Sequence, residues 1–222
     1  MSDANPLDAR ARMIARAARE ITAGMVVNLG IGLPTKVINH LPANLPVCLH
    51  TENGMTGIGA TLPYERADRN LIDAGGAYVS PIPGSAYFDS AVSFALVRSG
   101  RLDLTMLGAF EVAQNGDLAN WKIPGKFSPG AGGAIELAQK ARRVVVMTTH
   151  TDRHGNPKLL QQCTLPLTAQ RRVARIFTDL AVIDVTAHGF ELCELATGVT
   201  VQEVTEATGA PLIVPDTDIP TF

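Results

Sequence analysis

Cysteine is scarce in this 222-residue chain, and its three cysteines lie far apart. Cys48, Cys163 and Cys193 form no C-x-x-C pair, and each stands in an apolar neighbourhood. This spacing argues against a disulfide framework and against a four-ligand zinc site, and it is typical of a reducing compartment. We expect each thiol to pack as a small apolar side chain.

Long apolar runs and blocks of like charge are also missing. No run approaches the ~20 residues that cross a bilayer. The first twenty residues mix charges where a signal peptide would carry its apolar core. The formal net charge of −2 argues against nucleic-acid binding, which usually leaves a basic surface. We therefore expect a cytoplasmic protein with neither a membrane nor a nucleic acid as a partner.

The composition is that of a folded domain, with 46% hydrophobic and 18% charged residues. A chain of this length buries roughly 70% of its unfolded surface, so it needs no disulfides for stability. The sequence shows no internal repeat, low-complexity tract or linker. It therefore predicts a single domain over residues 1–222.

Apolar strand patterns alternate with helical patterns along the chain. Strands are expected at 25–30, 45–50, 102–110, 142–150 and 180–186, and helices at 7–24, 33–41, 85–100, 132–141, 167–177 and 200–209. Asp89 is placed to cap one helix, and Gly100 to end it. The alternation predicts an α/β fold: an open, largely parallel sheet with helices on both faces. Such sheets bind ligands beyond the carboxyl ends of their strands.

A carboxylate and a run of small residues follow the strand expected at 45–50. The chain there reads HTENGMTGIG, with Glu52 just past the strand. Most Glu-Asn-Gly sequences are hairpin turns in which the glutamate is simply solvated. Here Gly54, Gly57 and Gly59 leave the carboxylate uncovered, which is what a nucleophilic carboxylate needs if a large ligand is to approach it.

Two glycine-rich loops precede expected helices. In the first, Gly30 and Gly32 form G-x-G, but Thr35 stands where a dinucleotide fingerprint has its third glycine. Backbone N–H groups at that helix start can still hold an anionic group. The second loop, 130–133, is either an oxyanion or phosphate nest or an ordinary flexible entry to a helix.

The histidines do not predict a metal site. His150 and His154 are four residues apart, but they lie in a turn-rich loop with no third ligand in view. Solvated loop histidines are the better interpretation. No G-x-S-x-G pattern is present, so a serine–histidine hydrolase is not indicated.

Six segments, in order along nearly the whole chain, carry a resemblance to a known family. They are NLGIGLPTKV (28–37), LHTENGMTGIG (49–59), GSAYFDSAVSFALVRSGRLDLTMLGAFEV (84–112), LANWKIPGK (118–126), PGAGGAIELA (129–138) and CTLPLTAQRRVARIFTDLAVIDV (163–185). Together they resemble the B (β) subunits of family I coenzyme A transferases, the 3-oxoacid group. The family signature has a Ser-Glu-Asn-Gly core, and this chain keeps a hydroxyl at the serine position with Thr51.

The resemblance implies that Glu52 is a covalent nucleophile in a ping-pong reaction through a glutamyl-CoA thioester. Coenzyme A is then a substrate and part of a covalent intermediate, and no tightly bound cofactor or metal is expected. Gly132 and Gly133 match the family loop that supplies an oxyanion donor. The positions that the resemblance assigns to CoA contact are Gly30, Ile31, Gly32, Leu33, Pro34, Asn53 and Lys158, the last as a basic group for the CoA phosphates.

The resemblance also implies a partner, the A (α) subunit, in an α2β2 assembly. It leaves the acid open: acetoacetate with succinyl-CoA, 3-oxoadipate with succinyl-CoA, and acetate with acetoacetyl-CoA all fit. Two other functions stay open. One is an acyl-CoA hydrolase that uses the same glutamate chemistry, and the other is a non-catalytic ligand-binding protein on the same fold.

Overall fold

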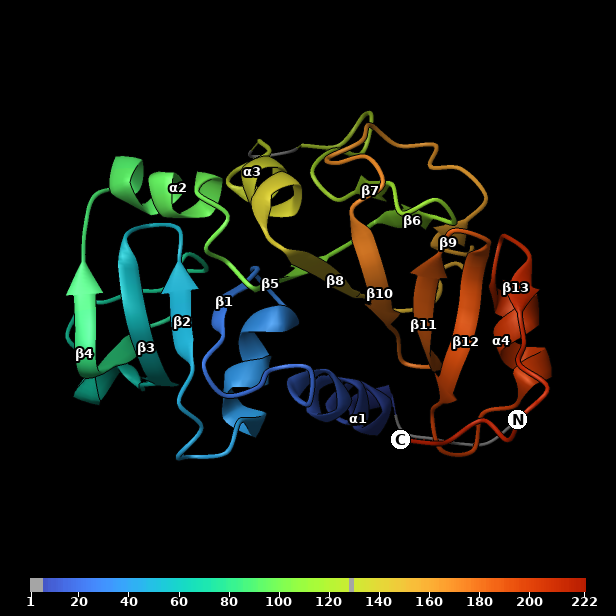
Figure 1. The fold of residues 1–222 in the computed structure, drawn as a ribbon, viewed down its shortest axis with the longest axis horizontal. Helices are drawn as coiled ribbons and strands as arrows, with labels where there is room; N and C mark the ends of the chain where they lie inside the picture. The colour runs from blue at the N-terminus through green and yellow to red at the C-terminus, as the bar shows by residue number, and fades with distance from the viewer. Residues whose placement is uncertain (1–5, 128–129) are drawn as a thin grey trace.

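A ten-stranded sheet runs the length of the molecule in the computed structural model, which describes residues 6–127 and 130–222 (Figure 1). In sheet order the strands are β13 (Leu212–Ile213), β12 (Gly189–Leu195), β11 (Ala181–Thr186), β10 (Val173–Phe177), β8 (Arg143–Met147), β5 (Leu104–Gly108), β1 (Val26–Leu29), β2 (Cys48–Thr51), β3 (Met55–Thr61) and β4 (Val79–Tyr87). A smaller sheet has the order β7 (Leu118–Ala119), β6 (Glu111–Ala113) and β9 (Leu159–Leu160).

The centre of the large sheet is parallel and its two ends are partly antiparallel. β2, β1, β5, β8 and β10 pair in parallel, whereas β3 and β4 at one end and β11 and β12 at the other pair antiparallel. The carboxyl ends of the central strands therefore meet at one edge, where a ligand site is expected.

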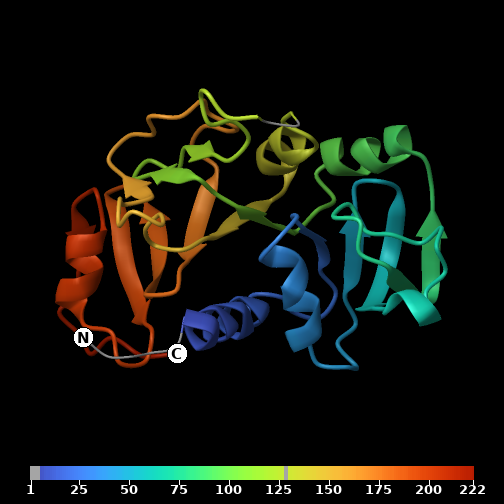
Figure 2. The same ribbon diagram turned by 180° about the vertical axis from the view of Figure 1, so that it is seen from behind.

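Helices cover both faces of this sheet, as the sequence predicts. α2 (Ser90–Arg98) and α3 (Ala134–Lys140) lie along the upper side in Figure 1, and α1 (Pro6–Ala18) and the 3-10 helix η1 (Pro34–His40) lie below. β8 shows the two-sided burial: Val144 and Val146 join the core under α2 and α3, while Val145 and Met147 join the core under α1. A fourth helix, α4 (Val201–Ala207), lies beside β12 and β13 (Figure 2).

The helix predicted at 167–177 is wrong. Residues 173–177 form β10, and an irregular segment with an isolated bridge between Ala169 and Leu118 precedes it. β10 is covered on both faces, so Ile176 and Phe177 are both fully buried and strand alternation is lost from the sequence. Arg175 lies opposite Asp184 on β11 and binds its carboxylate, and this cross-strand ion pair favours the strand.

The helix predicted at 85–100 begins later than expected. Residues 85–87 belong to β4, which forms an unpredicted hairpin with β3, and α2 starts after them. The Asp89 cap is confirmed, since its side chain accepts a hydrogen bond from the Val92 N–H at 2.9 Å. All five predicted strands are present. The structure also contains strands that the sequence did not predict, such as β12.

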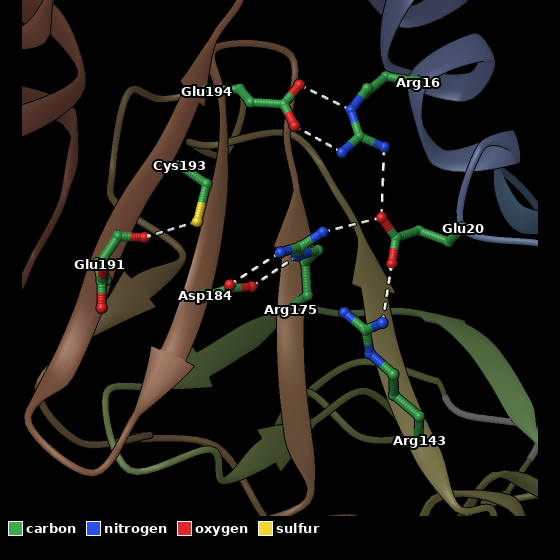
Figure 3. A network of polar contacts seen from close by, with 8 residues as sticks. All are labelled: Arg16, Glu20, Arg143, Arg175, Asp184, Glu191, Cys193 and Glu194. Atoms are coloured by element: carbon green, nitrogen blue, oxygen red, sulfur yellow. Dashed lines mark hydrogen bonds and ion pairs between the residues drawn. The ribbon is translucent and has the colours of Figure 1, made fainter. Parts of the chain in front are cut away.

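A partly buried ion-pair network ties α1 to the sheet (Figure 3). Glu20, just after α1, pairs with Arg16, with Arg143 of β8 and with Arg175 of β10. Arg16 also binds the Glu194 carboxylate through two nitrogens. These contacts fix the position of α1, whose first turns border the candidate site.

Within the described residues, no helix is long and apolar enough to span a membrane.

Candidate active site

A pocket of about 730 Å³ opens beyond the carboxyl ends of the parallel strands. Its lining comes from the loop after β1, the turn after β2, the loops after β5 and β8, and the glycine loop that leads into α3. Segments far apart in sequence therefore meet where a parallel sheet normally places its ligand.

Glu52 lies in the turn of the β2–β3 hairpin, where Thr51 pairs with Met55. The hairpin interpretation of the motif is therefore correct for the backbone. Gly54 is required there: its φ is +125°, and a Cβ would lie 2.0 Å from the Phe88 carbonyl oxygen. Glu52 is not simply solvated, however, because its half-buried side chain lines the pocket.

A buried asparagine on β1 holds the Glu52 carboxylate. The Nδ2 of Asn28 donates to Glu52 Oε2 at 3.1 Å and to the His50 carbonyl at 3.2 Å. Its Oδ1 accepts from the Thr105 hydroxyl at 3.3 Å. These partners aim the amide N–H₂ at the carboxylate. Sequence reasoning missed Asn28, although a polar residue inside the apolar stretch MVVNL was a usable signal.

The environment behind Glu52 is polar but uncharged near neutral pH. His50 is buried, with Nε2 2.9 Å from the Ser93 hydroxyl, and burial lowers its pKa to about 4. The imidazole is therefore neutral at pH 7. In the described ranges no cation forms an ion pair with Glu52, so the carboxylate is not locked in a salt bridge.

The glycine loop packs against this carboxylate. A Cβ on Gly133 would lie 3.3 Å from Glu52 Cγ and 3.0 Å from the Phe94 ring. Gly132 has φ +53°, with open space where its side chain would point. A bound group at Glu52 would therefore meet bare backbone of residues 132–133.

Most of the predicted site residues come together in this one pocket. The shared lining includes Glu52, Gly132, Gly133, Gly30, Ile31, Leu33 and Lys158. Sequence reasoning missed Arg10, Asn120, Thr148 and Thr149, which also line it. Arg10 comes from α1 and the two threonines directly follow β8, and no local pattern signals such long-range neighbours.

Three predicted residues lie outside the lining. The Asn53 side chain donates to the Ile72 carbonyl at 2.8 Å and accepts from the Thr51 hydroxyl at 2.6 Å. Pro34 is buried at the start of η1, and the Gly32 carbonyl accepts from the Thr35 hydroxyl. The structure gives these three residues a part in shaping the loop and the turn around the pocket.

His150, His154 and Cys163 lie outside the lining of this pocket. His150 is buried between the Thr178 and Thr208 hydroxyls, so the expectation that it is solvated is wrong, whereas His154 is exposed. Burial raises the pKa of the Cys163 thiol to about 12. Across residues 6–127 and 130–222 no group of three histidine, cysteine or acidic side chains could hold a metal ion.

Comparison with known proteins now identifies the family. A family model described as coenzyme A transferase matches residues 10–207. The chain belongs to the coenzyme A transferase family. It is 50% identical over 203 residues to the beta subunit of a probable coenzyme A transferase of Bacillus subtilis, covering 91% of this chain and 94% of that one.

Two further comparisons extend this result. The chain is 48% identical over 207 residues to the B subunit of a probable succinyl-CoA:3-ketoacid coenzyme A transferase of Bacillus subtilis, covering 93% of this chain and 96% of that one. The crystal structure of an acyl-CoA transferase apoenzyme from Escherichia coli O157:H7 superposes with a TM-score of 0.77 at 21% identity. All of this chain matches 44% of that longer chain, and at this identity the likeness shows the fold alone.

Proposed function

We propose that this chain is the catalytic B subunit of an enzyme that moves coenzyme A between an acyl-CoA and a carboxylic acid, with Glu52 as the covalent nucleophile. The observation that carries the proposal is the position of Glu52. It is the one carboxylate among the described residues that line the pocket, held by Asn28 and faced by the glycine loop. The proposed acceptor is a 3-oxoacid such as acetoacetate or 3-oxoadipate, because a relative at 48% identity is named for 3-ketoacids.

The first half of the reaction loads CoA onto Glu52. A carboxylate oxygen attacks the thioester carbonyl, the C–S bond breaks and CoA leaves as a thiolate, giving a mixed anhydride. The thiolate then attacks the glutamyl carbonyl, and the first acid leaves as a carboxylate. A glutamyl-CoA thioester is left. The acceptor carboxylate reverses these two steps and regenerates Glu52.

The surrounding groups fit the demands of these steps. A carboxylate is ionised near pH 7, so no neighbouring base is needed, and His50 is neutral there. Each attack puts negative charge on a carbonyl oxygen, which needs fixed donors. The Asn28 amide and a backbone N–H of Gly132 or Gly133 are the proposed donors.

Binding of CoA is assigned to the loop after β1 and its neighbours. Gly30, Ile31 and Leu33 line the pocket beside Glu52 and are proposed to contact the thioester arm. Gly32, Pro34 and Asn53 are proposed to act indirectly, by holding the loop and the turn in shape. Lys158 supplies a cation for an anionic group of the substrate.

Incubation of the assembled enzyme with acyl-CoA in the absence of an acceptor acid should leave a thioester on Glu52. Mass spectrometry of the peptide that contains LHTENGMTGIG should place the CoA adduct on that residue. Borohydride should reduce the adduct and inactivate the enzyme, and hydroxylamine should cleave it. An adduct that maps to another residue would contradict the assignment.

The partner requirement gives a second test. We expect the purified chain alone to have negligible transferase activity and to gain it with an A-type partner in an α2β2 complex, because several relatives are named as B or beta subunits. Activity measured across a titration of the A-type partner, with the mass of the complex measured in parallel, checks this. Full activity of a homo-oligomer of this chain would overturn it.

A further inference from the structure

A row of polar side chains crosses three central strands behind Glu52. Asn28 on β1 is in register with His50 on β2 and with Thr105 on β5. Register partners on neighbouring strands point to the same face of the sheet, so the three side chains lie side by side. All three are buried. Ser93 of α2, which is also buried, meets the His50 end of the row.

The fold itself does not require a polar row at this place. On the opposite face of the same strands the buried side chains are apolar, among them Val27, Leu49 and Met106. A buried hydrogen-bonded pair gains little stability over apolar groups of the same shape. What the row does provide is a set of fixed hydrogen-bond directions. These converge on Asn28, the residue that binds the Glu52 carboxylate.

The acceptors around Asn28 determine which way its amide points. One terminal atom of the amide lies 3.1 Å from Glu52 Oε2 and 3.2 Å from the His50 carbonyl oxygen. A carboxylate and a carbonyl only accept hydrogen bonds, so this atom is the donor, Nδ2. The other terminal atom, Oδ1, accepts from the Thr105 hydroxyl at 3.3 Å.

The same amide determines which nitrogen of His50 carries the proton. Asn28 Nδ2 lies 3.4 Å from His50 Nδ1. Because an amide N–H₂ only donates, Nδ1 is the bare nitrogen and Nε2 carries the hydrogen. Nε2 then donates to the Ser93 hydroxyl at 2.9 Å. Burial lowers the pKa of His50 to about 4, so the form with hydrogen on both nitrogens is scarce near neutral pH.

Moving the His50 proton to Nδ1 would reverse the Asn28 amide. Two N–H donors would then face each other, and a half-turn of the amide would relieve the conflict by bringing Oδ1 to Nδ1–H. That half-turn would also place Oδ1 against the Glu52 carboxylate, where an attraction becomes a repulsion between two oxygens. Ser93 opposes the change, because its hydroxyl gives the buried Nε2–H a partner.

We propose that His50 and Ser93 are positioning residues of the transfer reaction. Ser93 keeps the His50 proton on Nε2, and the bare Nδ1 keeps the Asn28 N–H₂ turned toward Glu52. The amide thereby holds the attacking carboxylate, and later the oxyanion that forms on the glutamyl carbonyl. Neither His50 nor Ser93 lines the pocket, so both act through Asn28. The inference rests on the proposed function and adds to it the two residues behind Asn28.

The first test is a series of variants of the complete A–B complex. His50→Leu removes both ring nitrogens and should lower kcat by ~10- to 100-fold, the scale of a lost hydrogen bond to a charged group. CoA affinity, measured by calorimetry, should not change, because the lining of the pocket is untouched. Ser93→Ala should give a smaller loss of kcat. His50→Gln should restore most of the rate, because its amide offers an acceptor to Asn28 and a donor to Ser93.

Two further variants separate positioning from stability. Val97→Ala opens a cavity in the same helix as Ser93 and leaves the polar row intact, so it should lower the melting temperature and keep kcat. The double change His50→Leu with Ser93→Ala replaces both partners of one hydrogen bond with apolar groups. It should melt near the wild-type temperature and still turn over slowly.

Crystal structures of the complexes give a readout that does not depend on turnover. The Glu52 carboxylate should leave its place 3.1 Å from Asn28 Nδ2 in His50→Leu and return to it in His50→Gln.

Wild-type kcat in the folded His50→Leu or double variant would refute the positioning role. A rate that His50→Gln fails to restore, or a Glu52 carboxylate that stays in place in His50→Leu, would refute it as well. If the wild-type complex transfers no CoA, the proposed function fails separately, and the crystal structures alone then decide whether His50 positions Glu52.

Discussion

Replacing Glu52 with glutamine should abolish CoA transfer and leave the pocket intact. Glutamine has the same shape, and its oxygen can still accept the hydrogen bond from Asn28 Nδ2. What it lacks is the anionic oxygen that attacks the thioester. Loss of a covalent nucleophile costs on the order of 10⁴–10⁶ in kcat. Initial rates of the A–B complex with acyl-CoA and acceptor acid measure the effect, and CoA binding should survive.

Glu52→Asp completes this test because it keeps the charge and shortens the reach by one methylene. The carboxylate can then no longer occupy the point 3.1 Å from Asn28 Nδ2, and a misplacement of this size costs ~10²-fold or more. Glu65→Gln makes the same chemical change as Glu52→Gln at an exposed carboxylate outside the pocket, and it should retain full activity. Normal turnover by the folded Glu52→Gln complex would refute the covalent mechanism.

The sequence was informative where local pattern and fold coincide. Each parallel strand of the sheet's centre except β10 was predicted from its apolar run, and the order of strand and helix implied an edge at which the site would form. Glu52 could be singled out because a carboxylate followed by Gly54, Gly57 and Gly59 is a local feature. The same logic found the glycine loop before α3.

The features that the sequence did not predict share one physical cause. They depend on burial, or on partners, that lie far away in the sequence. β10 was mistaken for a helix because both of its faces are buried and because Arg175 finds Asp184 and Glu20 only in the folded chain. Asn28 was missed because its partner Glu52 lies 24 residues away. Lys158 was found, but the Thr148 and Thr149 hydroxyls that orient it become neighbours only when the loop folds back on β8.

The glycine loop supplies the second large effect. Gly133→Val should reduce turnover by ~10²–10³-fold, the cost of one lost oxyanion donor. The backbone at Gly133 is ordinary, with φ −79°, so valine is not forbidden by its backbone angles. The side chain is the obstacle, because a Cβ there already lies 3.3 Å from Glu52 Cγ and 3.0 Å from the Phe94 ring. Steady-state rates, together with a thermal melt of the complex, measure the loss.

Two companion variants separate damage at the reacting group from damage to the fold. At Gly132, with φ +53° and open space, Gly132→Asn should lose less activity, because asparagine tolerates this left-handed conformation.

The double change Gly133→Ala with Phe94→Leu relieves the contact with the ring and leaves the contact with Glu52. If turnover is lost because the side chain at position 133 displaces Glu52, the double variant should melt at the wild-type temperature and still turn over slowly. Wild-type rates in the folded Gly133→Val variant would show that residues 132–133 do not face the reaction. A wild-type melting temperature and a wild-type rate in the double variant would show that Gly133 only makes room for packing against α2. The oxyanion donors at Glu52 would then be Asn28 or other groups.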